Sequence, residues 1–189
     1  MADLIAVNGE DVDRFPAVRQ WEALAEAGRR NQAALRERGH ALPGAAEVLA
    51  HLAEDSDIIQ SVLTGNIEAN ARVKLGAFGL DRWLDFEVGG FGTESAVRAD
   101  LVPVAQGKAR TRYGFDPRQG VTVVVGDTEL DVEAGLNGGA RVVGVATGSR
   151  TVEELREAGA HAVLPDLRDL NAVLHALAVV RQLGPAAIR

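Results

Sequence analysis

The 189-residue chain contains no cysteine, one methionine, one tyrosine and only two lysines, and aromatic residues make up 4% of it. The lack of cysteine excludes disulfide bridges, thiolate zinc sites and cysteine nucleophiles. The four histidines are scattered and do not have the spacing of metal ligands. Any chemistry must therefore rest on oxygen-bearing side chains.

Long apolar runs and blocks of basic residues are also lacking. No run of 18 or more apolar residues occurs, and no basic segment followed by an apolar stretch occurs at the start, so we expect no membrane span, no secretion signal and a cytoplasmic location. The formal net charge of −7 argues against nucleic acid or an anionic membrane surface as a partner. A small anion bound locally remains compatible with this charge.

The apolar content of 47% is enough for a core, and the sequence changes character near "GHALPGA", residues 39–45. Before this point, "MADLIAVNG" is typical of a short apolar helix ended by Gly9. Residues 15–38 predict one long charged helix ended by Gly39. We therefore expect an all-helical region over 1–40 and a different unit over 41–189.

From residue 41 on, short apolar runs alternate with helical patterns. The runs that predict strands are 57–63, 85–88, 121–125 and 141–146. Between them lie amphipathic helices such as 45–53, in which Val48 and Leu52 share one face. Continuous apolar strands separated by helices indicate an α/β fold with a parallel sheet covered on both sides.

In such sheets ligands bind beyond the carboxyl ends of the strands, and polar residues follow the first expected strand at that place. Thr64 offers a hydroxyl, and we expect the amides of Gly65 and Asn66 to open a helix whose N-terminus favours an anion. The sequence therefore indicates a phosphate site at 64–66. Simple helix capping is the alternative, because threonine and asparagine are common N-cap residues.

The stretch "VVVGDTELD" places two acids after the expected strand 121–125. Asp127 follows the strand, and Asp131 lies in the first turn of the next helix, four residues later. Two carboxylates converging on one point suit a hard cation such as Mg²⁺, which prefers oxygen ligands. Here too the alternative is that the acids only cap the helix.

Three stretches, "SVLTGN", "FEVGGFG" and "VVVGDTELDVEAGLNGGARVVGVATGSRTVEELREAGAHAVLPDL", resemble the core of the haloacid dehalogenase superfamily, with greatest similarity to its phosphoglycolate phosphatase-like members. "LPGAAEVLAHL" at 42–52 matches the family's entry helix. The resemblance implies a Rossmann-like parallel sheet over 41–189 and part of a helical cap over 1–40. It also implies a Mg²⁺-dependent phosphatase for a small phosphorylated metabolite, with Thr64 binding phosphate, Asp127 binding the metal and Asp131 as its acidic companion.

The family also uses a basic residue, more often lysine, to neutralise the transferring phosphoryl group. Lys74 is ten residues beyond Thr64, which on a helix is roughly 15 Å away and too far for its side chain. Lys108 lies toward the far end of the helix that follows "GGFGTES", whereas Arg98 lies in the first turn of that helix. We therefore expect Arg98 to fill the role, the alternative being an exposed surface arginine.

The family's nucleophile is the first aspartate of a D-x-D motif that directly ends the first core strand, and we do not find it in this chain. One literal match is Asp11-Val12-Asp13, which is separated from the apolar run 4–7 by Asn8-Gly9-Glu10. We interpret these acids as helix-capping residues and the run 4–7 as helical. The chain should then be inactive alone, the alternative class being a noncatalytic remnant or binding module.

The strand that carries this nucleophile is central in the family, between the strand ending at Thr64 and the one ending at Asp127. Its absence would leave two unpaired strand edges where a continuous sheet should be. Bare edges recruit other strands, so we expect the isolated chain to be marginally stable, to self-associate through these edges, or to repair the sheet with its own residues 3–7.

Overall fold

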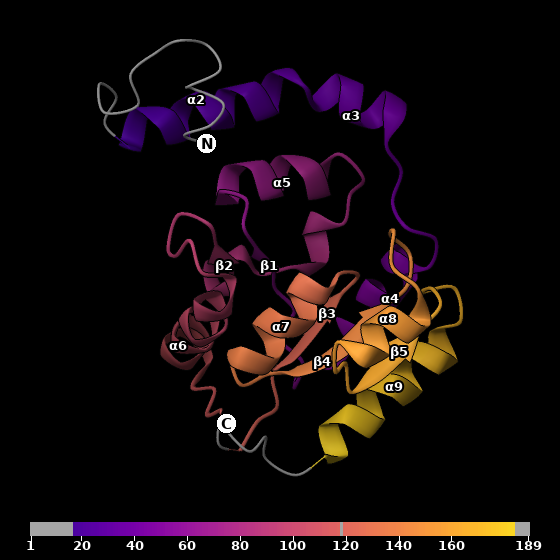
Figure 1. Cartoon of the computed structure of the whole chain (residues 1–189). Coiled ribbons are helices and arrows are strands. Elements are labelled where there is room, and N and C mark those ends of the chain that lie inside the picture. The colour runs from indigo at the N-terminus through magenta and orange to yellow at the C-terminus, as the bar shows by residue number, and fades with distance from the viewer. Residues whose placement is uncertain (1–16, 118, 184–189) are drawn as a thin grey trace.

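In the computed structural model of the chain, residues 17–117 and 119–183 are described. Two helices come first, α2 (Ala17–Arg30) and α3 (Gln32–Arg38), and they lie over α5 (Glu68–Gly76) at one end of the molecule (Figure 1). The expected helix over 1–9 lies outside the described part of the chain. The start of the expected helix 15–38 also lies outside it. No helix in the described part is both long enough and apolar enough to cross a membrane.

The expected single helix up to residue 38 is divided at Asn31. Both the backbone amide and the side-chain amide of Asn31 donate to the carbonyl oxygen of Ala27. An asparagine side chain that competes for a backbone carbonyl favours a turn over a continuing helix. The expected end of α3 is confirmed, because the amide of Gly39 donates to Leu35 and its backbone is extended.

The five strands within the described residues are short and all their pairings are parallel, which confirms an α/β fold with flanking helices. A two-stranded sheet has the order β1-β2, and a three-stranded sheet has the order β3-β4-β5. The strands are β1 (Leu63–Thr64), β2 (Gly90–Phe91), β3 (Val123–Gly126), β4 (Arg141–Val145) and β5 (Ala162–Leu164).

Two of the expected strands need correction. The expected strand 57–63 is reduced to β1, although the carbonyls of Gln60 and Val62 still accept hydrogen bonds from Asp85 and Gly90. The expected strand 85–88 is wrong, because Phe86–Val88 form a 3-10 turn, η3. The carboxylate of Asp85 accepts a hydrogen bond from the amide of Glu87, which favours this turn over an extended strand.

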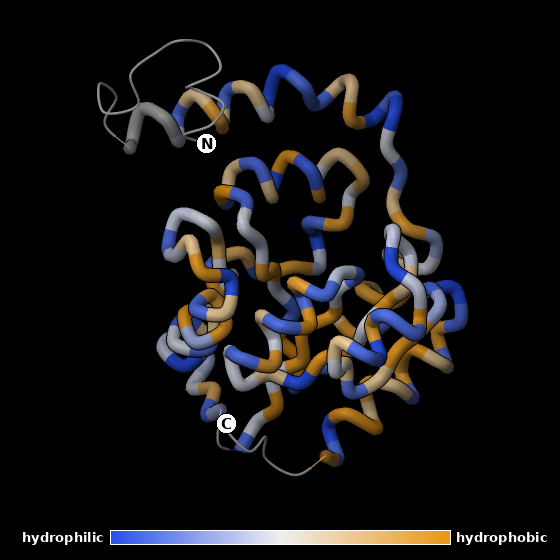
Figure 2. The backbone as a smooth tube through the Cα atoms, viewed as in Figure 1, coloured by the Kyte–Doolittle hydropathy of each residue, from blue (hydrophilic) through white to orange (hydrophobic). Residues whose placement is uncertain are grey.

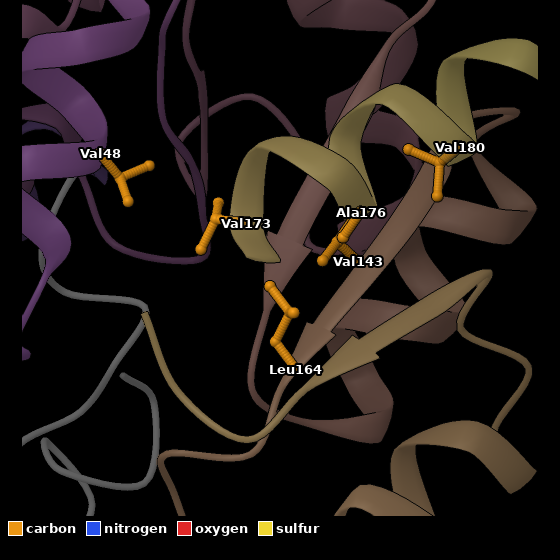
Figure 3. Packing of buried hydrophobic residues seen from close by; sticks show 6 residues of the cluster. All are labelled: Val48, Val143, Leu164, Val173, Ala176 and Val180. Atoms are coloured by element: carbon orange, nitrogen blue, oxygen red, sulfur yellow. The ribbon is translucent and has the colours of Figure 1, made fainter. Parts of the chain in front are cut away.

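Helices cover both faces of the three-stranded sheet. Those after α5 are α6 (Leu101–Tyr113), α7 (Glu129–Asn137), α8 (Val152–Glu157) and α9 (Leu170–Gln182), and α4 (Ala45–Leu52) precedes β1. On one face, α4 and α9 pack on the strands through a buried cluster shown in Figure 3: Val48, Val143, Leu164, Val173, Ala176 and Val180. On the other face, Val132 of α7 and Leu155 of α8 pack on Val142. Figure 2 shows hydrophobic residues gathered in the strands and facing helices, while α2 and α3 alternate between hydrophilic and hydrophobic positions.

The two sheets lie beside each other without being joined. No described strand hydrogen bonds to both β1 and β3. Leu63 of β1 nevertheless packs on a buried cluster of Val102, Val124 and Ala140, which contains a residue of β3. The carboxyl ends of β1 and β3 are therefore brought near each other by shared packing, and the absence of a central strand stays a prediction.

Candidate active site

Thr64 ends β1 and forms a tight turn with Asn66. The Thr64 hydroxyl oxygen accepts hydrogen bonds from the backbone amide and the side-chain amide of Asn66, at 3.1 and 2.9 Å. A hydroxyl that accepts two hydrogen bonds still has its own proton to donate. Thr64 can therefore act as a donor to an anion at the end of the strand.

The helix that follows starts later than expected. Helix α5 begins at Glu68 after Ile67, so Gly65 and Asn66 precede it and their amides do not open it. The turn made by Asn66 with Thr64 explains the delay, because it uses the Asn66 amide before the helix starts. Gly65 itself is exposed, and nothing lies within 4 Å of where a side chain would begin.

Lys74 reaches this turn, which corrects the expectation that it lies too far away. Its ammonium nitrogen is 3.2 Å from the side-chain oxygen of Asn66. The expected distance of roughly 15 Å assumed a helix that starts at Thr64, whereas α5 starts at Glu68. In addition, side chains on a helix lean toward its N-terminus, which brings Lys74 closer to the turn. A positive charge therefore lies beside the Thr64 turn.

At the end of β3, Asp131 forms a capping box with Thr128, which is the N-cap residue of α7. One oxygen of Asp131 accepts from the Thr128 hydroxyl at 2.7 Å and from the amides of Thr128 and Asp127 at 3.1 and 3.2 Å. Asp131 therefore caps α7, as the capping alternative predicts. Gly126 makes room for this arrangement, because a side chain there would collide with Asp131.

The other oxygen of Asp131 pairs with Arg98. The guanidinium nitrogen of Arg98 lies 2.7 Å from it, and the Arg98 side chain is 36% exposed against 10% for Asp131. Arg98 belongs to a 3-10 turn, η4 (Arg98–Asp100), which immediately precedes α6 and packs on α7. The structure thus places Arg98 at the carboxyl end of β3, whereas Lys108 pairs with Glu94 and donates to the carbonyl of Gly89.

The carboxylate of Asp127 is in a different situation from that of Asp131. It is half-buried, and the described part of the chain gives it no hydrogen bond or ion pair. Its oxygen lies against Gly148, in the loop that follows β4. Sequence reasoning missed this loop, although "ATGS" at 146–149 follows an expected strand and the rule that sites lie at strand ends could have found it.

Two residues in segments that contact this strand end have buried polar atoms without described partners. The described residues contain three such side-chain atoms, and two of them, Arg98 Nε and Thr147 Oγ1, belong to residues around this strand end. Unsatisfied buried polar atoms in native proteins often mark a place where a ligand, ion or water binds. The carboxyl end of β3 is therefore the best candidate for a binding site.

The fit of these residues to a divalent cation is partial. Within 17–117 and 119–183, no group of three or more acidic or histidine residues is arranged to hold a metal ion. Asp127 offers a free carboxylate of the kind that Mg²⁺ prefers, while both oxygens of Asp131 already have protein partners. The described residues can thus supply one direct ligand, and the remaining positions would be filled by water or other groups.

The described chain combines a parallel α/β fold with Thr64 at the end of β1 and Asp127 directly after β3. Comparisons with known proteins find similarity to hydrolases. A family model for HAD-hydrolase-like proteins matches residues 97–170. The probable phosphatase IndB of Dickeya dadantii (strain 3937) is 28% identical over 180 residues, which are 92% of this chain and 71% of that protein. The chain is therefore similar to proteins of the haloacid dehalogenase superfamily, and the family model covers residues 97–170 of it.

Solved structures share the fold. A hydrolase from Pseudomonas syringae is 27% identical with a TM-score of 0.61, and the match covers 84% of this chain and 71% of that chain. A HAD family hydrolase from Deinococcus radiodurans R1, solved with bound phosphate and sodium, is 23% identical with a TM-score of 0.58, and the match covers 76% of this chain and 62% of that chain. The chain spans 55% of a Bacteroides vulgatus protein assigned as a beta-phosphoglucomutase, so the activities of such longer proteins are not assigned to it.

Proposed function

We propose that the chain carries the phosphate- and cation-binding part of a Mg²⁺-dependent phosphatase for a small phosphate monoester, of the phosphoglycolate phosphatase-like kind. The observation that carries the proposal is that the carboxyl ends of β1 and β3 both carry polar groups suited to a phosphate and a cation. Among the residues 17–117 and 119–183, Thr64 ends β1 with a hydroxyl proton free to donate, and Asp127 follows β3 with a carboxylate that no described residue pairs with. The two strands are linked by the packing of Leu63 on the cluster that contains Val124.

The charges around these strand ends suit a phosphoryl group held with a cation. Lys74 lies beside the Thr64 turn, and Arg98 lies beside Asp131 with one buried nitrogen unpaired. Cationic side chains stabilise the negative charge of a transferring phosphoryl group. We assign Arg98 to this role, with Lys74 as a second cation close to the phosphate.

Asp127 is the residue that would hold Mg²⁺ directly. A bound Mg²⁺ would polarise the phosphoryl oxygens and offset their charge. Asp131 would support the site without binding the cation itself. Its carboxylate accepts a hydrogen bond from the Asp127 amide and pairs with the Arg98 guanidinium, which holds both residues in place. This agrees with the resemblance, which implies that Asp127 binds the metal and that Asp131 is its acidic companion.

The nucleophile is the part that we do not find. In the family it is an aspartate that attacks phosphorus, displaces the alcohol and forms an aspartyl-phosphate, which water then hydrolyses. The matching D-x-D at Asp11–Asp13 lies outside the described residues, and its spacing from the preceding apolar run differs from that of the family. We therefore propose that the 189-residue chain by itself binds phosphate without turning over phosphate esters.

A binding module without catalysis is the second candidate. It is favoured by the observation that the described residues offer no cluster of three metal-binding side chains. Such a module would still bind an anion at Thr64, so turnover and binding must be measured separately. In either case, the chain's acidic net charge of −7 and the lack of cysteine suit a cytoplasmic protein with a small-molecule partner and no nucleic-acid partner.

The direct test of the proposed site is titration of the ¹⁵N-labelled chain with orthophosphate, with and without Mg²⁺. We expect the amide signals of residues 64–66 to shift, and those of 126–128 to shift when Mg²⁺ is present. Thr64→Val, which keeps the shape and removes the hydroxyl, should weaken phosphate binding about tenfold, because a hydrogen bond to a charged group is lost. Thr64→Ser keeps the hydroxyl and should bind nearly as wild type does. Equal binding by Thr64→Val and wild type would show that the phosphate site lies elsewhere.

A further inference from the structure

The loop between β4 and α8, residues 146–150, is fastened at both ends. The amide of Ala146 donates to the carbonyl of Leu164 in β5 at 2.9 Å. At the other end, Arg150 pairs with Glu129 in the first turn of α7 at 2.9 Å, and Thr151 then caps α8 with a capping box. The loop is therefore held against the strand end that carries Asp127.

Gly148 is the point at which this loop meets Asp127. A Cβ atom built on Gly148 would lie 2.5 Å from Asp127 Oδ2, and its three nearest heavy atoms all belong to the Asp127 side chain. Real Cβ atoms essentially never approach another atom so closely, so either the loop or the carboxylate would have to move. Because the loop is fastened and the carboxylate can rotate, the carboxylate is the part that gives way.

Other common reasons for a glycine do not apply at this position. The φ angle of Gly148 is not positive, so residues other than glycine can adopt its backbone conformation. It is also exposed to solvent, so burial does not demand a small residue. The Asp127 carboxylate is thus the feature of the described structure that requires glycine here.

The residue before Gly148 adds a second unpaired group. The hydroxyl oxygen of Thr147 is buried and has no hydrogen-bond partner among the described residues. Its backbone amide donates to Val145 at 2.8 Å, which fixes the residue at the end of β4. The loop therefore carries a hydroxyl without a described partner one residue before the glycine that meets the Asp127 carboxylate.

We propose that Gly148 is a positioning residue, whose missing side chain lets the Asp127 carboxylate take the orientation in which it holds a divalent cation. The cation part rests on the proposed function, whereas the orientation of the carboxylate does not. A side chain at position 148 turns the carboxylate aside while the fold is kept. Groups that orient a metal ligand typically change metal affinity when they are altered.

The first measurement needs no metal. The side-chain carboxyl carbon of Asp127 is followed by ¹³C NMR in wild type, Gly148→Ala and the control Gly107→Ala. Gly107 has nothing within 4 Å of where its Cβ would lie, so the control makes the same chemical change in open space. We expect the Asp127 carboxyl resonance to shift in Gly148→Ala only, with the amide spectrum otherwise preserved.

The second measurement is Mn²⁺ binding, followed by the paramagnetic broadening of the amide signals of residues 126–128. Gly148→Ala should raise the dissociation constant about tenfold, as loss of ligand orientation does in other metal sites. In an Asp127→Asn background, the same substitution should cause no further loss, because the group that it displaces no longer binds the metal. A merely structural effect of Gly148→Ala would persist in that background.

The outcomes separate the two proposals. Wild-type affinity and an unshifted Asp127 resonance in Gly148→Ala would overturn the inference, as would an equal loss of affinity in the Asp127→Asn background. Failure of the wild-type chain to bind Mn²⁺ near Asp127 would overturn the proposed function. In that case the Asp127 resonance alone decides whether Gly148 sets the position of the carboxylate.

Discussion

Asp127 and Asp131 are only four residues apart, but their carboxylates lie in different surroundings. Sequence reasoning located both acids at a strand end, because "VVVGDTELD" shows where the apolar run stops. Only the family resemblance gave the two acids different roles, because the surroundings of each acid depend on partners from distant parts of the chain. Arg98, which pairs with Asp131, and Gly148, which lies against Asp127, come from loops that only the fold brings there.

The two acids should therefore differ in their effect on stability. Asp131→Asn weakens the capping box and the ion pair with Arg98 and should lower the free energy of unfolding by about 1–3 kcal/mol. Asp127→Asn replaces a carboxylate that has no hydrogen-bond or ion-pair partner among the described residues, and it should change the free energy of unfolding by less than about 0.5 kcal/mol. Urea denaturation of the two variants checks this, and equal destabilisation would show that Asp127 also has a structural role.

His161 gives a prediction for the pH dependence of stability. Its Nδ1 atom accepts a hydrogen bond from the amide of Val142, and burial, together with the nearby Arg141 guanidinium, lowers its pKa. A lowered pKa means that the unfolded chain binds the proton more readily. The stabilising contribution is therefore complete above the unfolded value of about 6.5 and is lost as the pH falls toward the folded pKa.

We accordingly expect the free energy of unfolding to fall between pH 7 and pH 5, and to fall less in His161→Asn. Asparagine offers an oxygen that can accept from the Val142 amide but does not bind a proton in this range. Denaturation curves at both pH values, for wild type and variant, give the comparison. An identical decrease in the two proteins would show that other groups cause the pH dependence.

At the scale of elements, patterns of the sequence predicted helices better than strands. Helix α4 was predicted almost to its ends, because Val48 and Leu52 mark its apolar face. The stretch 85–88 was misread because "DFEV" is too short for its apolar pattern to separate a strand from a turn, and the Asp85 side chain decided the outcome. Strand β5 was not predicted, since Ala162–Leu164 is only three residues long.

The contact between α2 and α5 depends on a glycine in α2. A Cβ atom on Gly28 would collide with the side-chain oxygen of Asn70 in α5. We expect Gly28→Ala to loosen this contact, seen as faster hydrogen exchange in α2, although alanine is the better helix former by about 1 kcal/mol. Gly107 lies in the middle of α6, and nothing lies within 4 Å of where its Cβ would be. Gly107→Ala is therefore the matched control and should leave the exchange of α2 unchanged. Unchanged exchange in Gly28→Ala would mean that Asn70 adapts without cost.

At the scale of the whole molecule, the separation of the two sheets is the feature with the widest consequences. The side of β3 away from β4 has no described strand partner, and Val125 in this strand is 52% exposed. Bare strand edges with exposed apolar residues recruit other strands. The sequence could predict this only by resemblance, because no local pattern reports which strand is a neighbour of which.

We therefore propose that the chain self-associates through these edges. Sedimentation at increasing protein concentration should show a growing fraction of dimers or larger species. In the monomer, the amides of β1 and β3 that face away from β2 and β4 should exchange quickly. Strong protection of these amides in a monomer, together with strand-like pairing of residues 4–7, would contradict both the open edges and the helical interpretation of that run.

The central claim is that this chain holds the phosphate and cation groups of a phosphatase site without the nucleophile that the chemistry requires. The most direct test is hydrolysis of p-nitrophenyl phosphate by the purified 189-residue chain in the presence of Mg²⁺. We predict no turnover above that of a buffer control, in wild type and in Asp127→Asn alike. Mg²⁺-dependent turnover that disappears in Asp127→Asn would contradict the claim, and a further loss in Asp11→Asn would identify Asp11 as the nucleophile.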